Sequence, residues 1–241
     1  MRNRIFLGLT AAACALLPVS LPAQGVFNMG MLTNTLTQGG SDSSSVSSVR
    51  NSGGFRQMLR PAPRGPVRIN PAALNFRPDK AARKRNMARF VASIRRVDPA
   101  GAKGLQDVLT KHDLIAEMNV QLPHSGLRAN SVPDAMALYL VTAWYGVRGS
   151  TDSKPADFRA VRDQFARAIG TTRGYAGTSN AEKQQMSESM LLQAMIADQA
   201  VQNAKGNPAQ LRQLRNNLNA GARATFGFDL TQLRLGPNGL G

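Results

Sequence analysis

The sequence predicts an all-α protein, a single bundle of five or six helices preceded by a disordered basic arm. Three observations lead to this prediction. Apolar residues recur at helical spacing in successive segments after Leu74, no stretch alternates with a period of two, and basic residues gather ahead of and within the first helix. The chain has 241 residues and is 42% hydrophobic, which suffices for one packed domain.

The amino-terminal residues, 1–23, have the features of a secretory signal peptide. Arg2 and Arg4 precede an apolar run over residues 5–17, and Ala23 supplies the small residue that cleavage requires. The run is shorter than the roughly 20 residues that a spanning helix needs. We therefore expect export to the periplasm or the exterior, and a mature chain without a transmembrane segment. Lipidation at Cys14 remains an alternative to ordinary cleavage.

Residues 24–73 predict a flexible arm. Its first half is rich in glycine, serine, asparagine and threonine, and so buries too little apolar surface to offset the entropy of ordering. In its second half, arginines at four-residue spacing stand among prolines, which exclude a helix and favour an extended, polyproline-like chain. The helical domain is accordingly expected over residues 74–241.

The first expected helices follow a clear apolar stripe. Pro78 suits the first position of a helix. Asp98–Pro99 ends this helix and opens a weaker one, and a further short helical turn is expected over residues 113–120. The stripe comprises Met87, Phe90, Val91, Ile94 and Val97.

The next helix is expected to be the centre of the bundle. Ser131 predicts its N-cap, with Asp134 three residues on as the reciprocal partner. From there to Val147 the segment has almost no polar face, which is typical of a buried helix. Gly146 and Gly149 are expected to end it.

Three more helices complete the bundle. One is expected over residues 155–170. Ser179 and Glu182 form a capping box in the sequence before a long helix. Asn207–Pro208 opens the last helix, Gly227 closes it, and the remaining tail is expected to pack back on the core.

The residue inventory argues against several kinds of chemistry. A single cysteine excludes a disulfide framework and a cysteine-rich metal site. The two histidines, His112 and His124, are too far apart in sequence to suggest a metal centre. Because no nucleophile elbow surrounds Ser125 beside His124, a structural role is favoured for both histidines. We expect neither a metal nor a cofactor.

Three carboxylates are weak candidates for catalysis. Exported helical proteins include polysaccharide hydrolases, which need two carboxyl groups about 5–10 Å apart, one with a raised pKa. Glu117, Asp134 and Glu188 lie on or beside apolar helices and could converge. Each also has a simpler interpretation: Glu117 is solvated, Asp134 is a cap, and Glu188 belongs to an amphipathic helix. An envelope polysaccharide hydrolase therefore remains the alternative.

The basic segment over residues 50–96 is the feature that an ordinary globular domain explains least. It holds thirteen lysines and arginines against one acid, Asp79. Such a segment attracts polyanions by releasing counterions. Sequence-specific nucleic-acid reading is disfavoured, since between residue 50 and the first expected helix only Phe55 and Phe76 are available for stacking. The predicted anion-binding residues are Arg56, Arg60, Arg64, Arg68, Arg83, Lys84, Arg85 and Arg89.

Several short motifs occur in this sequence in the same order as in a known protein family. Residues 126–135 (GLRANSVPDA) precede Tyr139 and Trp144. The further motifs are Asn86 with Phe90–Val91, Asp98–Pro99, Glu182–Lys183–Gln184 with Glu188, and Gly227–Phe228–Asp229–Leu230. Together they are similar, over about residues 75–235, to a family of exported bacterial proteins of unknown function. Pro133 departs from the small residue expected there. The resemblance implies an exported helical domain without an assigned activity. Its possible site positions are Asn130, Asp134, Tyr139, Trp144, Gln184 and Glu188.

The leading hypothesis is thus an exported, non-enzymatic helical domain that binds an anionic envelope surface or polyanion through residues 50–96. The alternatives are the hydrolase named above and an accessory subunit of a surface or export assembly, which would bind a protein partner.

Overall fold

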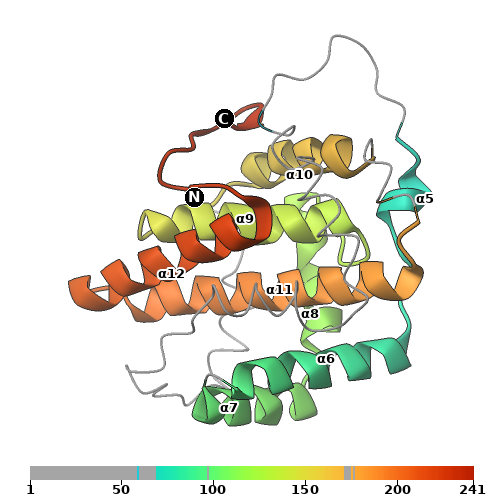
Figure 1. Ribbon diagram of the computed structural model, residues 1–241, viewed down its shortest axis with the longest axis horizontal. Coiled ribbons are helices and arrows are strands. Elements are labelled where there is room, and N and C mark those ends of the chain that lie inside the picture. Colours follow the sequence, from blue (N-terminus) through green and yellow to red (C-terminus); the bar gives the residue numbers. More distant parts are fainter. Residues whose placement is uncertain (1–58, 60–68, 97, 171–174, 176) are drawn as a thin grey trace.

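The computed structural model describes residues 59, 69–96, 98–170, 175 and 177–241, and in this part helices dominate (Figure 1). Besides the α-helices there are a short 3-10 helix, η1, and a two-stranded antiparallel hairpin at the carboxyl end. The α-helices are α5 (Pro71–Leu74), α6 (Lys80–Arg95), α7 (Pro99–Lys111), α8 (Leu114–Gln121), α9 (Val132–Val147), α10 (Pro155–Gly170), α11 (Asn180–Asn203) and α12 (Pro208–Phe226). The other elements are η1 (Leu122–Ser125), β1 (Leu235–Gly236) and β2 (Gly239–Leu240).

The predicted helical class is confirmed, but the predicted count of five or six helices is wrong, because the described residues hold eight α-helices. One extra helix is α5, a single turn of four residues, which is too short to show a periodic apolar pattern in the sequence. Another is α8, expected only as a short helical turn over residues 113–120: the chain breaks at His112, whose backbone is extended, and a cap at Asp113 starts a separate helix. The hairpin was not expected either, because two-residue strands are too short to show a period of two.

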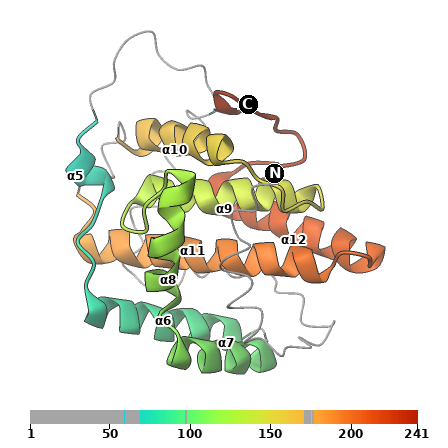
Figure 2. The same ribbon diagram turned by 180° about the vertical axis from the view of Figure 1, so that it is seen from behind.

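Two helices form the centre of the bundle. α9 is buried along almost its whole length, as predicted, and it packs mainly against α11. α10 and α12 cover the remaining sides of α9, while α6 packs against α11 and α7 packs against α6 (Figure 1). Seen from behind, α8 runs crosswise from the α6–α7 layer toward α9 (Figure 2). The molecule thus has a hydrophobic centre and a thinner outer layer made of α6 and α7.

Short polar side chains start most helices. Asp98 caps α7 and is followed by Pro99, as predicted, and the capping box of Ser179 and Glu182 is present at α11. Asn207 caps α12 by accepting from the Gln210 N–H at 3.1 Å. These side chains satisfy backbone N–H groups that have no partner inside the helix.

One predicted helix start was wrong, and at a second helix the predicted N-cap is present but its expected hydrogen bonds are not. The N-cap of α6 is Asp79 rather than a helix start at Pro78, because the Asp79 carboxylate accepts from the Ala82 N–H at 2.5 Å. Ser131 occupies the N-cap of α9 but makes no capping hydrogen bond with its side chain. Its expected reciprocal partner, Asp134, accepts instead from the Arg128 N–H at 2.8 Å.

Glycines close two helices and lie inside another. Gly227 ends α12 with φ 78°, as predicted, and Gly149 follows α9 with φ 71°. Gly146, expected to end α9, lies within it. A Cβ there would stand 2.6 Å from Leu218 Cδ1 and 3.0 Å from Val201 Cγ2. Gly146 therefore allows α11 and α12 to approach α9 closely.

The carboxyl-terminal tail packs on the core, as expected. Phe228, Leu230 and Leu240 are buried, and the Trp144 indole N–H donates to the Leu233 carbonyl at 3.0 Å. The hairpin contacts α10 (Figure 1).

None of the helices in the described ranges combines the length and the apolar character that crossing a membrane requires. The predictions for residues 1–58 and 60–68, which include the signal peptide and Cys14, lie outside the described residues.

Candidate functional site: a basic groove along helix α6

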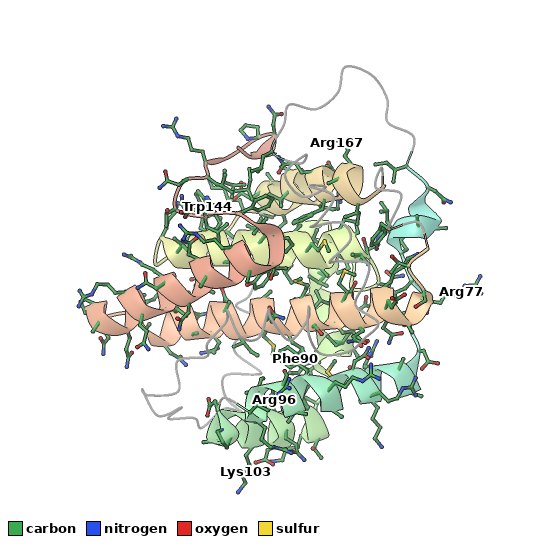
Figure 3. All side chains as sticks on the ribbon, viewed as in Figure 1. Arg77, Phe90, Arg96, Lys103, Trp144 and Arg167 are labelled. Atoms are coloured by element: carbon green, nitrogen blue, oxygen red, sulfur yellow. The ribbon has the colours of Figure 1, made fainter. Side chains whose placement is uncertain are left out.

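Helix α6 carries most of the described basic segment, and its side chains fall on three faces. Side chains that include Asn86 and Phe90 face α11 (Figure 3). Arg85 and Arg89 are exposed and do not line the groove. The third face, which begins with Lys80 and Lys84, borders α7 and the start of α8. This division follows from helical spacing, because residues three or four apart share a face.

Two amide side chains of α11 hold the segment that leads into α6. The Asn180 amide accepts from the Arg77 N–H at 2.7 Å and donates to the Arg77 carbonyl at 2.8 Å. The Gln184 amide does the same at Asp79, accepting at 3.0 Å and donating at 2.8 Å. Amides one helical turn apart thus pair with alternate residues of an extended chain. We call Asn180 and Gln184 the amide clamp.

One turn further along α11, Glu188 holds the body of α6. Its side chain is fully buried. The carboxylate accepts from Asn86 Nδ2 at 2.7 Å, from Gln184 Nε2 at 2.9 Å and from Arg83 Nε at 3.1 Å. A buried carboxylate requires such pairing, because burial of an unpaired charge is costly.

Arg83 stands at the border between the buried face and the groove. While its Nε donates to Glu188, its Nη1 donates to Asp113 Oδ2 at 2.7 Å, and 20% of its side chain stays exposed. The other carboxylate oxygen of Asp113 caps α8 by accepting from the Ala116 N–H at 3.0 Å. The two carboxylates therefore fix the plane of the guanidinium and tie three helices together.

The groove itself lies between α6, α7 and the first residue of α8, and has a volume of about 800 Å³. Its lining combines basic and apolar side chains and has a single acid. The charged lining residues are Lys80, Arg83, Lys84, Arg95, Lys111 and Asp113. The apolar ones are Met87, Ala88, Val91, Leu109 and Leu114, and Gln106, Thr110 and His112 complete it.

The positive charge of this groove is only partly neutralised. Lys80, Lys84 and Lys111 make no hydrogen bond or ion pair within the part of the chain that the structure describes, and all three are exposed. Arg95 donates to the Gln106 amide on α7. The arrangement can attract and hold an anion, since ammonium and guanidinium groups surround one volume.

The predicted anion-binding residues are therefore distributed unevenly. Arg83 and Lys84 line the groove, whereas Arg85 does not and Arg89 Nη1 donates to Gln185 on α11 at 2.9 Å. Arg56, Arg60, Arg64 and Arg68 lie outside the described residues.

Sequence reasoning missed three basic residues of the groove as site residues. They are Lys80, Arg95 and Lys111. The helical spacing of Lys80, Lys84 and Met87 could have revealed Lys80, and Arg95 lies three turns beyond Lys84 on the same face. Lys111 comes from α7, and only the packing of the two helices brings it to the groove.

The three candidate catalytic carboxylates have separate partners. Glu117 pairs with His112 Nδ1 at 3.0 Å and is 41% exposed at its side chain. Asp134 lies at the start of α9, 2% exposed, where burial raises its pKa while the Arg128 N–H partly offsets the rise. Glu188 belongs to the contact with α6 described above.

The positions suggested by the family resemblance largely hold the chain together. The main-chain carbonyl of Asn130 accepts from the Phe76 N–H at 3.1 Å, and the Asn130 side-chain Nδ2 donates to the Phe76 carbonyl at 3.4 Å. Tyr139 is fully buried in the core. Trp144 is half-buried, with the Arg148 guanidinium 3.6 Å above its ring. With Gln184 and Glu188, these residues form contacts within the fold.

No group of three or more histidine, cysteine, aspartate or glutamate side chains that could hold a metal ion occurs among the described residues. His112, which lines the groove, contacts Glu117 Oε1 through Nδ1 at 3.0 Å.

Comparison with known proteins gives one match. Neither the curated proteins nor the solved structures provide a match to this chain. A family model described as a family of unknown function, DUF6683, matches residues 56–241, a range that takes in α5 to α12 and the hairpin. This confirms the resemblance to an uncharacterised family that the motifs indicate. The chain is a member of the family of unknown function DUF6683.

Proposed function

We propose that this protein is an exported, non-enzymatic helical domain that binds an anionic surface or polymer of the cell envelope through its basic segment. The observation that carries the proposal is the groove along α6, where five lysines and arginines meet one acid. The signal-peptide features of residues 1–23 support the export part of the proposal.

The charge state of the groove supports binding rather than a structural role for its lysines. Arg83 already has two carboxylate partners, so its charge is balanced within the fold. Lys80, Lys84 and Lys111 add three charges to the same volume, where mutual repulsion opposes their proximity. An anion in the groove would relieve this repulsion and release its own counterions, which makes the binding salt-dependent.

The lining favours an envelope anion over single-stranded nucleic acid. Proteins that bind single strands offer aromatic side chains on which bases stack. The groove offers no phenylalanine, tyrosine or tryptophan among its lining residues. Anionic lipid and anionic polysaccharide need no stacking platform.

Retention on anionic vesicles tests the proposal. The chain from residue 24 is mixed with vesicles that contain phosphatidylglycerol, and with neutral phosphatidylcholine vesicles, at low and at high salt. We expect retention on the anionic vesicles alone, lost at high salt. The triple variant Lys80→Ala, Lys84→Ala, Lys111→Ala should weaken retention about tenfold or more.

A matched triple variant separates the groove from net charge. Lys103, Lys154 and Arg212 are exposed and do not line the groove (Lys103 is labelled in Figure 3). Changing these three to alanine removes the same charge and should change retention less than threefold. Equal losses for the two triple variants, or retention that salt does not affect, would refute the proposal.

A further inference from the structure

We infer that the groove along α6 is a binding site for one monomeric, single-chain anionic amphiphile, with a phosphate or carboxylate head and an alkyl chain. This inference rests on the proposed function, because it assigns a ligand class to the same basic groove. It goes beyond that function by requiring an apolar contact that a charged polymer would not use.

The apolar lining residues of α6 follow the basic residues at its amino-terminal end along the same face of the helix. Along α6, the basic Lys80, Arg83 and Lys84 come first and Met87 and Val91 follow on the same face, while Arg95 beyond them already donates to Gln106. Leu109 borders the same volume from α7. A ligand with charge at one end and an alkyl chain at the other matches this order. Methionine suits such a floor, because its flexible thioether adapts to the shape of a chain.

The head of the ligand would meet a prepared guanidinium. The Arg83 Nε and Nη1 groups are held by Glu188 and Asp113, while its Nη2 makes no hydrogen bond within the described ranges. Lys80 and Lys84, on the same helix face, add two exposed ammonium groups. A guanidinium fixed before binding loses less entropy on binding an anion.

The size and lining of the groove suit one single-chain amphiphile. A volume of about 800 Å³ lies within the usual range of small-molecule sites, roughly 300–1,000 Å³. The apolar lining residues come from α6, α7 and the first residue of α8, so one alkyl chain inside the groove can contact all of them.

Calorimetric titration of the chain from residue 24 tests this with three probes. Dodecyl phosphate below its micelle concentration carries both head and chain. Inorganic phosphate carries the head alone, and dodecyl maltoside carries the same chain with a neutral head. We expect dodecyl phosphate to bind at least tenfold more tightly than either other probe, because burial of a few methylenes suffices for that factor.

Two variants locate the chain. Met87→Gln keeps the length of the side chain but makes the floor polar, and it should weaken dodecyl phosphate binding about fivefold or more while inorganic phosphate binding stays unchanged. Leu211→Gln, at a half-buried leucine of α12 that does not line the groove, is the matched control and should change neither. Circular dichroism of both variants checks that the fold is kept.

The outcomes separate this inference from the proposed function. Inorganic phosphate as tight as dodecyl phosphate, dodecyl maltoside as tight as dodecyl phosphate, or equal effects of Met87→Gln and Leu211→Gln would each overturn the amphiphile site. If vesicle retention still depends on the groove lysines in that case, the proposed function stands alone. If retention is also independent of those lysines, both fail.

Discussion

Helix α6 presents two contrasting faces to the rest of the molecule. On the face toward α11, Asn86 and the inner part of Arg83 meet the fully buried carboxylate of Glu188. On the face toward α7, Lys80 and Lys84 meet no acid within the described residues other than Asp113, which already pairs with Arg83. One helix therefore carries a guanidinium that is paired with carboxylates of the fold, at Arg83, and ammonium groups that have no acidic partner within the described residues, at Lys80 and Lys84.

The contrast between the two faces indicates which basic residues of a highly basic segment stabilise the fold and which are available to bind a ligand. A basic side chain with buried acidic partners stabilises the fold, and its loss would be seen first in stability. An exposed basic side chain over an apolar floor contributes little to stability, and its loss would be seen first in binding. The experiments below test this division.

The largest effect is expected at Glu188. Its replacement, Glu188→Ala, leaves Arg83, Asn86 and Gln184 without their shared acceptor in a buried place. We expect a loss of about 3 kcal/mol in the free energy of unfolding, measured by urea denaturation. Glu117→Ala, at a partly exposed carboxylate with His112 as partner, is the control and should cost less than about 1 kcal/mol. Equal losses in the two variants would show that the inner face is not fixed by Glu188.

A second buried acid of α11 sharpens the contrast, because it has no guanidinium partner among the residues that the structure describes. Asp198 is 4% exposed and accepts from Gln202 Nε2 at 2.7 Å. Burial raises its pKa to about 6, although the Gln202 hydrogen bond and the Lys205 charge partly oppose the rise. The folded protein therefore keeps this proton between about pH 4 and pH 6, where the unfolded chain releases it.

Stability from Asp198 should accordingly fall as the pH rises through that window and stay constant above it. Asp198→Asn retains the acceptor for Gln202 and removes the titration. We expect this variant to gain about 2 kcal/mol over the natural chain at neutral pH and little at about pH 4, by urea denaturation at both values. Asp107→Asn, at an exposed aspartate of α7, should show no such difference. A gain that does not vary with pH would contradict the titration of Asp198.

A smaller loss is expected from the amide clamp. Gln184→Leu keeps the volume of the buried side chain but removes the acceptor of the Asp79 N–H and one of the two donors to the Asp79 carbonyl, which still accepts from the Arg83 N–H. We expect a cost of about 1–2 kcal/mol and faster hydrogen exchange at the Asp79 amide. Gln213→Leu, at an exposed position of α12, is expected to stay within about 0.5 kcal/mol. Unchanged exchange at Asp79 would show that the clamp does not hold this segment.

The smallest change in stability is expected on the groove face. Lys84→Glu should alter the free energy of unfolding by no more than about 0.5 kcal/mol, because this exposed side chain has no partner within the described part of the chain. The same variant should reduce retention on anionic vesicles. Arg83→Gln, by contrast, should lower both stability and retention. If Lys84→Glu destabilises as much as Arg83→Gln, the two faces do not differ as described.

Much of the fold could be predicted from local chemistry. The apolar spacing and the caps at Asp98, Ser179 and Asn207 act within a few residues, so the sequence displays them directly. The failed details depend on distant contacts or on short elements. Asp134 binds the backbone of the preceding loop instead of reciprocating the cap at Ser131. The single turn of α5 and the hairpin lack a pattern long enough to detect.

The candidate site was less predictable, because it depends on pairs far apart in the chain. The basic character of α6 is evident in the sequence, but the partner of Arg83 at Glu188 lies 105 residues away. Residues on one helix cannot show which of its faces will be covered. For that reason Arg83 and Lys84, adjacent in sequence and similar in charge, appear equivalent until the packing of α7 and α11 separates them.

The amide clamp has a consequence for how this protein can diverge. Asn180 and Gln184 bond to main-chain atoms at positions 77 and 79, and main-chain atoms are common to every amino acid except for the proline nitrogen. The Arg77 side chain itself extends away from the body of the molecule (Figure 3). The attachment of α6 thus tolerates a new side chain at position 77, while position 79 is constrained by its cap on the Ala82 N–H, so that the chain ahead of the helix can change while the architecture is inherited intact.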